Sequence, residues 1–204
     1  MKRGLLIVVS GPSGVGKGTV LKQFMNDPEM NLAFSVSMTT RAMREGEQEG
    51  VNYYYVTKER FQEAVANGEL LEWTEFVGNC YGTPLAAVNR LRDEGKNVLL
   101  EIEVDGCRQV CEKCPDALTI FIVPPNMQEL EKRIRGRATE PEEIVQARLA
   151  KASKELEHAG DYRYTVCNDD VDLAADIIRV IIRHHMNKEF WSSKIGREKS
   201  KTVQ

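Results

Sequence analysis

The sequence predicts an α/β fold in which a parallel central sheet is flanked by helices. Apolar runs within residues 5–9, 97–103 and 118–123 have the length of strands that are buried on both faces. Apolar residues at helical spacing in 85–94 and 107–114 separate these runs. Strands that alternate with helices are typical of parallel sheets, because each crossover needs a long connection. A chain of 204 residues allows one such domain with small inserted units.

The segment between the first two strands predicts an inserted α+β unit at about residues 36–85. Aromatic and β-branched residues favour short strands there, and Thr57 can cap a helix. Glycines and acidic residues in 45–51 predict a solvated loop. The expected elements are an extended piece at 32–38, a strand at 53–56, a helix at 57–67, and strands at 70–76 and 81–83.

A helical pair is predicted at about residues 126–158. Asn126 and Glu129 form one capping box, and Thr139-Glu-Pro-Glu142 forms a second with its proline inside the first turn. After a strand at 164–167, a helix should cover the sheet with Leu173, Ala174, Ile177, Ile178 and Ile181. The expected core is 1–35, 86–125 and 159–186, followed by a basic tail at 187–204 that is mobile from residue 196.

Composition excludes several classes of function. A net charge of −3 and a pI of about 5.8 give no support for nucleic-acid binding. No apolar run is long enough for a signal peptide core or a membrane span, so we expect a cytoplasmic protein without a membrane partner. Five cysteines, an odd number, predict reduced thiols. Cys107, Cys111 and Cys114 share a helix face without a nearby histidine, so packing is favoured over zinc and no protein metal site is expected.

A glycine-rich turn, Gly11-Pro-Ser-Gly-Val-Gly-Lys17, follows the first strand and opens a helix. Its glycines can take positive φ and turn backbone N–H groups toward one centre, where the Lys17 ammonium and the helix N-terminus add positive charge. This pattern predicts a site for the β- and γ-phosphates of a nucleotide, although an ordinary glycine-rich turn is the alternative. Gly18 stands where a hydroxyl normally contacts Mg²⁺, so we expect Mg²⁺ to bind through phosphate oxygens and water. The predicted loop comprises Gly11, Pro12, Ser13, Gly14, Val15, Gly16, Lys17, Gly18 and Thr19, with Thr19 reaching a phosphate.

Arginines in the predicted helical pair favour phosphoryl transfer between two nucleotides. Such a transfer brings several negative charges together, and cations must screen them and align donor with acceptor. Arg133 and Arg137 lie one helical turn apart, and Arg148 starts from the next helix, so the pair could close as a lid that excludes water. For Arg135 we favour a solvated surface role.

Arg41 and Arg44 suit a phosphate dianion, which a guanidinium can bind with two hydrogen bonds. Other classes of nucleotide-binding protein with such a glycine-rich turn, or P-loop, fit the sequence less well. A GTPase needs an Asn/Thr-Lys-x-Asp motif, which the sequence lacks. A more distantly related ATPase needs a Walker-B aspartate at the end of a strand, whereas the candidate strand here is followed by Glu103.

Several motifs, in order, resemble those of the guanylate kinase family over residues 4 to about 185. The resemblance implies an α/β P-loop NTPase fold with an inserted α+β GMP-binding subdomain (36–85) and a helical lid (126–158). It also implies the reaction ATP + GMP ⇌ ADP + GDP with Mg²⁺, and dGMP is a further candidate acceptor. The motifs are Gly11-Pro-Ser-Gly-Val-Gly-Lys17, Phe34-Ser-Val-Ser37-Met-Thr-Thr-Arg41, Glu72-Trp73, Gly78-Asn-Cys-Tyr81-Gly-Thr83, Glu101-Ile-Glu103, Gly136-Arg137-Ala-Thr-Glu140 and Asn168-Asp169-Asp170.

The resemblance assigns roles by position. It implies that the GMP phosphate is held by Arg41, Arg44, Tyr53 and Tyr81, and guanine by Ser37, Glu72, Thr83 and Glu103. It implies that Lys17, Arg41, Arg133, Arg137 and Arg148 act on the transferring group, and that Asn168 lies near the ATP adenine. The residue types agree with guanine, because a carboxylate accepts from its N1–H and amine while hydroxyls donate to O6. Adenine presents the opposite pattern and would leave a buried carboxylate unpaired.

The sequence departs from the family pattern in three ways. Glu101 and Glu103 stand where aspartates are common, and Asp105 stands where glutamine is usual. Arg44 follows Met43 rather than a proline. A scaffold module on the same fold and a kinase for another base are the competing interpretations, and the oligomeric state is open. No general base is expected, because a GMP phosphate oxygen is already an anionic nucleophile.

Overall fold

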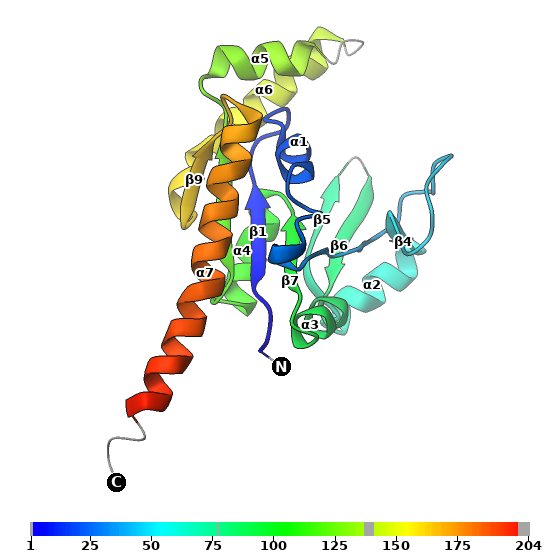
Figure 1. Ribbon diagram of the computed structural model, residues 1–204. Helices are drawn as coiled ribbons and strands as arrows, with labels where there is room; N and C mark the ends of the chain where they lie inside the picture. Colours follow the sequence, from blue (N-terminus) through cyan, green and yellow to red (C-terminus); the bar gives the residue numbers. More distant parts are fainter. Residues whose placement is uncertain (1, 77, 137–140, 200–204) are drawn as a thin grey trace.

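The computed structural model describes residues 2–76, 78–136 and 141–199, with side chains through residue 187. A five-stranded sheet runs through its centre, with all pairings parallel and the order β2-β7-β1-β8-β9 (Figure 1). The predicted parallel α/β fold is therefore confirmed. The strands are β1 (Leu6–Ser10), β2 (Leu32–Phe34), β7 (Asn97–Glu101), β8 (Leu118–Val123) and β9 (Tyr164–Cys167).

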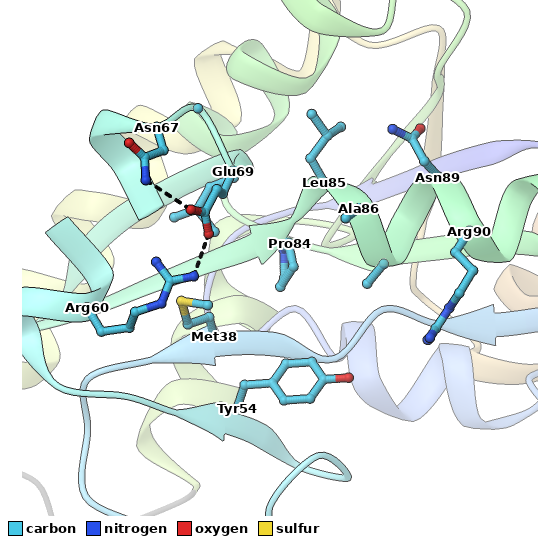
Figure 2. Close-up of a pocket in the computed structure, with 13 residues that line it drawn as sticks. Met38, Tyr54, Arg60, Asn67, Glu69, Pro84, Leu85, Ala86, Asn89 and Arg90 are labelled. Carbon is cyan, nitrogen blue, oxygen red and sulfur yellow. Dashed lines mark hydrogen bonds and ion pairs between the residues drawn. The ribbon is translucent and has the colours of Figure 1, made fainter. Parts of the chain in front are cut away.

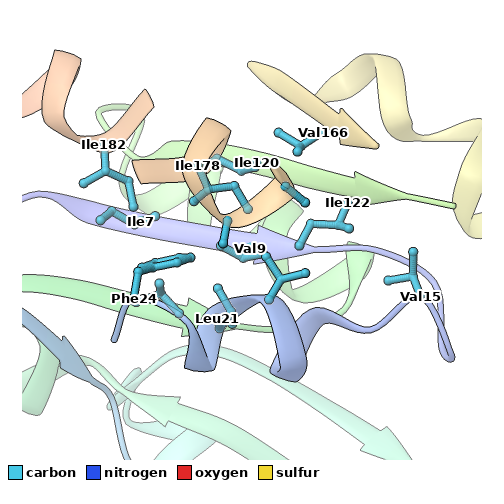
Figure 3. Close-up of a cluster of buried hydrophobic side chains, with 14 of the residues drawn as sticks. Ile7, Val9, Val15, Leu21, Phe24, Ile120, Ile122, Val166, Ile178 and Ile182 are labelled. Carbon is cyan, nitrogen blue, oxygen red and sulfur yellow. The ribbon is translucent and has the colours of Figure 1, made fainter. Parts of the chain in front are cut away.

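Helices cover both faces of this sheet, which is why β1 is apolar from Leu6 to Val9. Ile7 and Val9 pack on one side with α1 (Lys17–Lys22) and α7 (Val171–Lys199), as Figure 3 shows. Leu6 and Val8 point to the other side, toward α3 (Leu85–Asp93) and α4 (Val104–Lys113). Successive side chains of a strand alternate between faces, so a strand between two helical layers needs apolar residues at every position.

The inserted unit forms a second, four-stranded sheet in the order β4-β3-β6-β5. Phe61, Ala64 and Leu70 form its small core. The Thr57 hydroxyl accepts a hydrogen bond from the Arg60 backbone N–H at 3.2 Å, so the predicted cap is confirmed. The elements are β3 (Ser37–Thr39), β4 (Tyr53–Tyr55), α2 (Lys58–Ala66), β5 (Leu70–Phe76) and β6 (Asn79–Pro84).

The predicted helical pair is α5 (Met127–Arg135) and α6 (Glu142–Glu157). Asn126 Oδ1 accepts from the Glu129 backbone N–H at 2.8 Å, as the first capping box requires. The second cap differs from its prediction. Pro141 is extended, with φ −55° and ψ 149°, so it precedes α6 instead of lying in its first turn. Thr139 lies outside the described residues.

Two further boundaries differ from expectation. Strand β7 ends at Glu101 and α4 begins at Val104, so the predicted strand end at 103 is two residues too late. Helix α7 continues to Lys199, past the predicted start of the tail at 187. Two short 3₁₀ turns, η1 (Pro28–Met30) and η2 (Ala159–Asp161), complete the chain. Within the residues that the structure describes, no helix is long and apolar enough to cross a membrane.

The face that α7 turns to the sheet was only partly predicted. Ala174 and Ile178 are fully buried as expected, but Leu173 is 60% exposed and Ile177 41% exposed. Ile182 is buried in their place. This helix is apolar on most of its circumference, so spacing alone does not select the buried face.

Candidate active site

The glycine-rich turn lies between the end of β1 and the start of α1. Gly11, Gly14 and Gly16 have φ values of 152°, 88° and 93°. A Cβ at Gly14 would lie 2.7 Å from Ile134 Cγ1, and one at Gly11 would lie 2.4 Å from the Ile122 carbonyl oxygen. The turn therefore needs glycine both for its backbone conformation and for its close approach to α5 and β8.

Lys17 reaches back into this turn. Its ammonium donates to the Gly11 carbonyl oxygen at 2.6 Å and to that of Pro12 at 3.4 Å. Burial lowers the pKa of Lys17, and the nearby carboxylates of Glu101 and Glu155 oppose that shift. The ammonium therefore stands at the centre of a loop whose carbonyl contacts it can exchange for phosphate oxygens. Gly18 lies in α1 and Thr19 is exposed on it.

Cations from α5 and α6 meet the same loop. Arg148 donates to Ser13 Oγ at 2.9 Å, and Arg133 donates to the Val15 carbonyl oxygen at 3.3 Å. Arg137, the third predicted arginine, lies outside the described residues.

Arg135 pairs with Glu131 at 2.8 Å and with Glu142 at 2.6 Å. Its partners lie on α5 and α6 themselves, which fits a role on the surface of the helical pair. Asn168 also reaches the loop and donates to the Val15 carbonyl oxygen at 2.7 Å, while its buried Oδ1 has no partner among the described residues.

A cavity of about 320 Å³ opens beside β7, between the two sheets. Glu72 lines it and is only 4% exposed. The Thr83 hydroxyl donates to Glu72 Oε1 at 2.5 Å. Thr83 therefore orients the carboxylate in this structure, a role different from the expected donation to guanine O6. The predicted residues in the cavity wall are Ser37, Tyr53, Glu72, Tyr81 and Glu103.

Burial raises the pKa of Glu72, and the charge of Glu103 adds to that shift, while the Thr83 hydrogen bond and Lys113 oppose it. A buried carboxylate with a raised pKa is common where a charged ligand or a donor-rich ligand binds. Guanine presents such donors on one edge.

Arg41 lies next to Tyr53, which lines this cavity. Its guanidinium stands 5.4 Å from the ring centroid of Tyr53, whose ring meets that of Tyr81 at 6.0 Å. Glu47 accepts from Arg41 at 2.7 Å and 3.0 Å. Arg44 is exposed on the same loop, and its backbone N–H donates to Glu47 at 2.8 Å. The arrangement places the Arg41 guanidinium and the phenols of Tyr53 and Tyr81 close together.

Comparison with known proteins agrees with this geometry. The family model described as guanylate kinase matches residues 3–185. The chain belongs to the guanylate kinase family. It is an ATP-dependent phosphotransferase that phosphorylates GMP, and its use of ATP implies a divalent metal.

Relatives with this name cover nearly the whole chain. The guanylate kinase of Streptococcus thermophilus (strain CNRZ 1066) is 50% identical over 189 residues, which are 92% of this chain and 90% of that protein. The guanylate kinase of Lactococcus lactis subsp. lactis (strain IL1403) is 51% identical over 181 residues, 89% and 88% of the two chains. The crystal structure of guanylate kinase from Anaplasma phagocytophilum is similar with a TM-score of 0.70 and 35% identity, over 91% of this chain and 87% of that one.

Three residues of this guanylate kinase site were missed from the sequence. Glu47 was placed in a solvated loop, yet it holds Arg41 and also accepts from the Tyr55 hydroxyl at 2.7 Å. Gly106 of α4 lies against Glu72, because a Cβ there would be 2.7 Å from Glu72 Oε2. Lys151 of α6 donates to both carboxylate oxygens of Glu103. No local pattern marks these contacts, since the partners of Gly106 and Lys151 lie on distant segments.

A larger cavity, about 780 Å³, lies between α2 and α3 on another side of the inserted unit. Figure 2 shows the Arg60–Glu69 ion pair at one end of it and Arg90 of α3 at the other. No predicted site residue lines it. Among the described residues, no group of three or more His, Cys, Asp or Glu side chains could hold a metal ion.

Proposed function

We propose that ATP binds at the turn of residues 11–19, GMP binds in the 320 Å³ cavity, and the γ-phosphoryl group passes directly between them. Both sites border Glu101, the last residue of β7, and Glu103, which follows that strand. A GMP phosphate oxygen is itself the nucleophile, so the protein aligns the two nucleotides and neutralises charge. The proposal keeps the expected cytoplasmic location.

The buried carboxylate of Glu72 is the observation that carries this proposal. An ionised carboxylate only accepts hydrogen bonds, and guanine offers N1–H and an amine as donors. Thr83 already uses one oxygen of Glu72, which fixes the orientation of the carboxylate. Adenine in the same place would leave Glu72 buried without its partners, a penalty of about 1–3 kcal/mol. Ser37 and Glu103 complete the base wall.

The GMP phosphate is assigned to Arg41, Arg44, Tyr53 and Tyr81. Arg41 can bind a phosphate with two parallel hydrogen bonds, and its ion pair with Glu47 holds it near the phenols in this structure. The charge and donor types of this group fit a phosphate dianion.

On the ATP side, Lys17 exchanges its loop carbonyls for β- and γ-phosphate oxygens. Arg133 and Arg148 already contact the loop, so they and Arg137 are assigned to the transferring phosphoryl group. Closure of the lid at 126–158 over the triphosphate then excludes water and prevents hydrolysis. Asn168 is assigned to the adenine.

The residues present fit Mg²⁺ as the divalent metal. Gly18 has no hydroxyl for the ion, but Glu101 Oε2 lies 4.0 Å from the position that a Cβ of Gly18 would take. A carboxylate at that distance from the loop can accept hydrogen bonds from metal-bound water. When bound, Mg²⁺ neutralises charge on the phosphates, and Glu101 is the residue assigned to hold its water shell.

The test replaces Glu72 with Gln, which puts an amide donor against the guanine donors and leaves the shape unchanged. We expect the KM for GMP to rise roughly 30-fold or more, the equivalent of about 2 kcal/mol, and the KM for ATP to change less than twofold. Glu75→Gln, an exposed change on the same strand, is the matched control. Equal losses for the two substrates would contradict the assignment of Glu72 to the base.

A further inference from the structure

Lys151 of α6 lies where three parts of the molecule meet. Its ammonium is 3.0 Å and 2.9 Å from the two carboxylate oxygens of Glu103. It also stands 5.1 Å from the ring centroid of Phe76, at the end of β5 in the inserted unit. Glu103 and Phe76 both line the 320 Å³ cavity. One side chain of the lid therefore contacts the central core and the inserted unit at the wall of that cavity.

Lys151 is also linked, through neighbouring charged side chains of α6, to the glycine-rich turn at residues 11–19. Glu155 lies one turn further along α6, with its Oε1 3.8 Å from Lys151 Nζ. The Glu155 side chain is 11% exposed, and the positive charge of Lys17 in the glycine-rich turn opposes the rise in its pKa that burial causes. Arg148, one turn earlier on α6, donates to the Ser13 hydroxyl. A series of charged groups thus runs from Lys17 through Glu155 and Lys151 to Glu103.

Charge explains why this contact matters for the base. Glu103 lies close enough to Glu72 for its charge to disfavour ionisation of Glu72. Lys151 compensates the Glu103 charge from the lid side. Removing the ammonium would leave two carboxylates without this compensation at the guanine wall and would free α6 from the cavity.

We propose that Lys151 is a positioning residue that couples the two substrate sites. ATP on the glycine-rich turn then strengthens GMP binding in the cavity, and GMP in the cavity strengthens ATP binding on the turn. This inference rests on the proposed placement of the two nucleotides. When α6 is drawn to the loop by ATP, Lys151 holds Glu103 in the orientation that guanine requires. Coupling of this kind is reciprocal between the two ligands.

The experiment measures the Kd of GMP by calorimetry with and without a saturating non-hydrolysable ATP analogue and Mg²⁺. The coupling factor is the Kd of GMP without the ATP analogue divided by the Kd with it. We expect a factor above one in the wild type, a decrease of about threefold to fivefold in Lys151→Met, and recovery in Lys151→Arg. Lys154→Met is the matched control, an exposed lysine on the same helix without a Glu103 contact, and should keep the wild-type factor.

A second measurement separates coupling from a change in stability. In a Glu103→Gln background, Lys151→Met should change the factor no further, because its partner is already neutral. A wild-type factor of one, or an unchanged factor in Lys151→Met, would overturn the coupling role. Wild-type protein that binds no GMP under either condition would instead overturn the proposed function. Melting temperatures close to that of the wild type check that the variants are folded.

Discussion

Replacing Gly106 with Ala should impair GMP binding strongly while it changes the stability of the protein little. Gly106 is buried within α4 and faces Glu72 of β5. A Cβ at this position would lie 2.7 Å from Glu72 Oε2 and 3.4 Å from Glu72 Cδ. Real Cβ contacts are not that short, so the carboxylate has to move.

The expected magnitude follows from what Glu72 loses. Moving it disturbs the 2.5 Å hydrogen bond from Thr83, and hydrogen bonds to charged groups contribute about 1.5–3 kcal/mol. A misaligned carboxylate should therefore raise the KM for GMP roughly 30-fold, the equivalent of about 2 kcal/mol. Alanine favours a helix interior over glycine by about 1 kcal/mol, which offsets part of the strain on stability.

The assay compares KM values for GMP and ATP together with the melting temperature of the unliganded protein. We expect a large rise for GMP, little change for ATP and a melting temperature within a few degrees of the wild type. Gly160→Ala is the control, because a Cβ at Gly160 meets nothing within 4 Å. A Gly106→Ala protein with a wild-type KM for GMP would refute the assignment of Glu72 to the base.

Three further predictions concern charged groups. Lys17→Met should abolish turnover without lowering the melting temperature by more than a few degrees, as measured by ADP release and thermal unfolding; retained turnover would contradict its phosphate role. Glu47→Gln should free Arg41 and raise the KM for GMP severalfold at unchanged KM for ATP, and an unaltered KM would show that the ion pair does not position Arg41. Because burial raises the pKa of Glu72, its acceptor charge is lost early as pH falls. The KM for GMP should therefore rise with falling pH at values above the ordinary carboxyl pKa, and Glu72→Gln should show a smaller rise; identical pH profiles would exclude Glu72 as the titrating group.

The sequence predicts the fold well because the informative patterns are local. The apolar run at β1 indicates a strand that is buried on both faces, and the glycines of the glycine-rich turn indicate backbone positions with positive φ. Helix α7 shows the limit, because Ile177 and Ile178 are adjacent in the chain and both apolar, yet only Ile178 is buried. Ile182 is buried on α7 although it was not among the predicted residues, a property of packing that spacing does not encode.

The residues of the candidate site also differ in whether the sequence alone could predict them. Glu72 and Arg41 belong to recognisable motifs, so their part in the site could be predicted. Glu47 and Lys151 could not, because a charged residue on a loop or helix usually faces solvent. Their contacts to Arg41 and Glu103 arise only once the chain is folded. Thr83 is intermediate, since its position was predicted and its partner was not.

The most direct measurement of the central claim is a coupled assay of ADP formation with ATP, Mg²⁺ and each of GMP, dGMP, AMP, UMP and CMP. The account predicts turnover with GMP at a kcat/KM at least a hundredfold above those for AMP, UMP and CMP, because only guanine satisfies the buried carboxylate of Glu72. Comparable turnover with AMP, or ATP binding without any GDP formed from GMP, would contradict it.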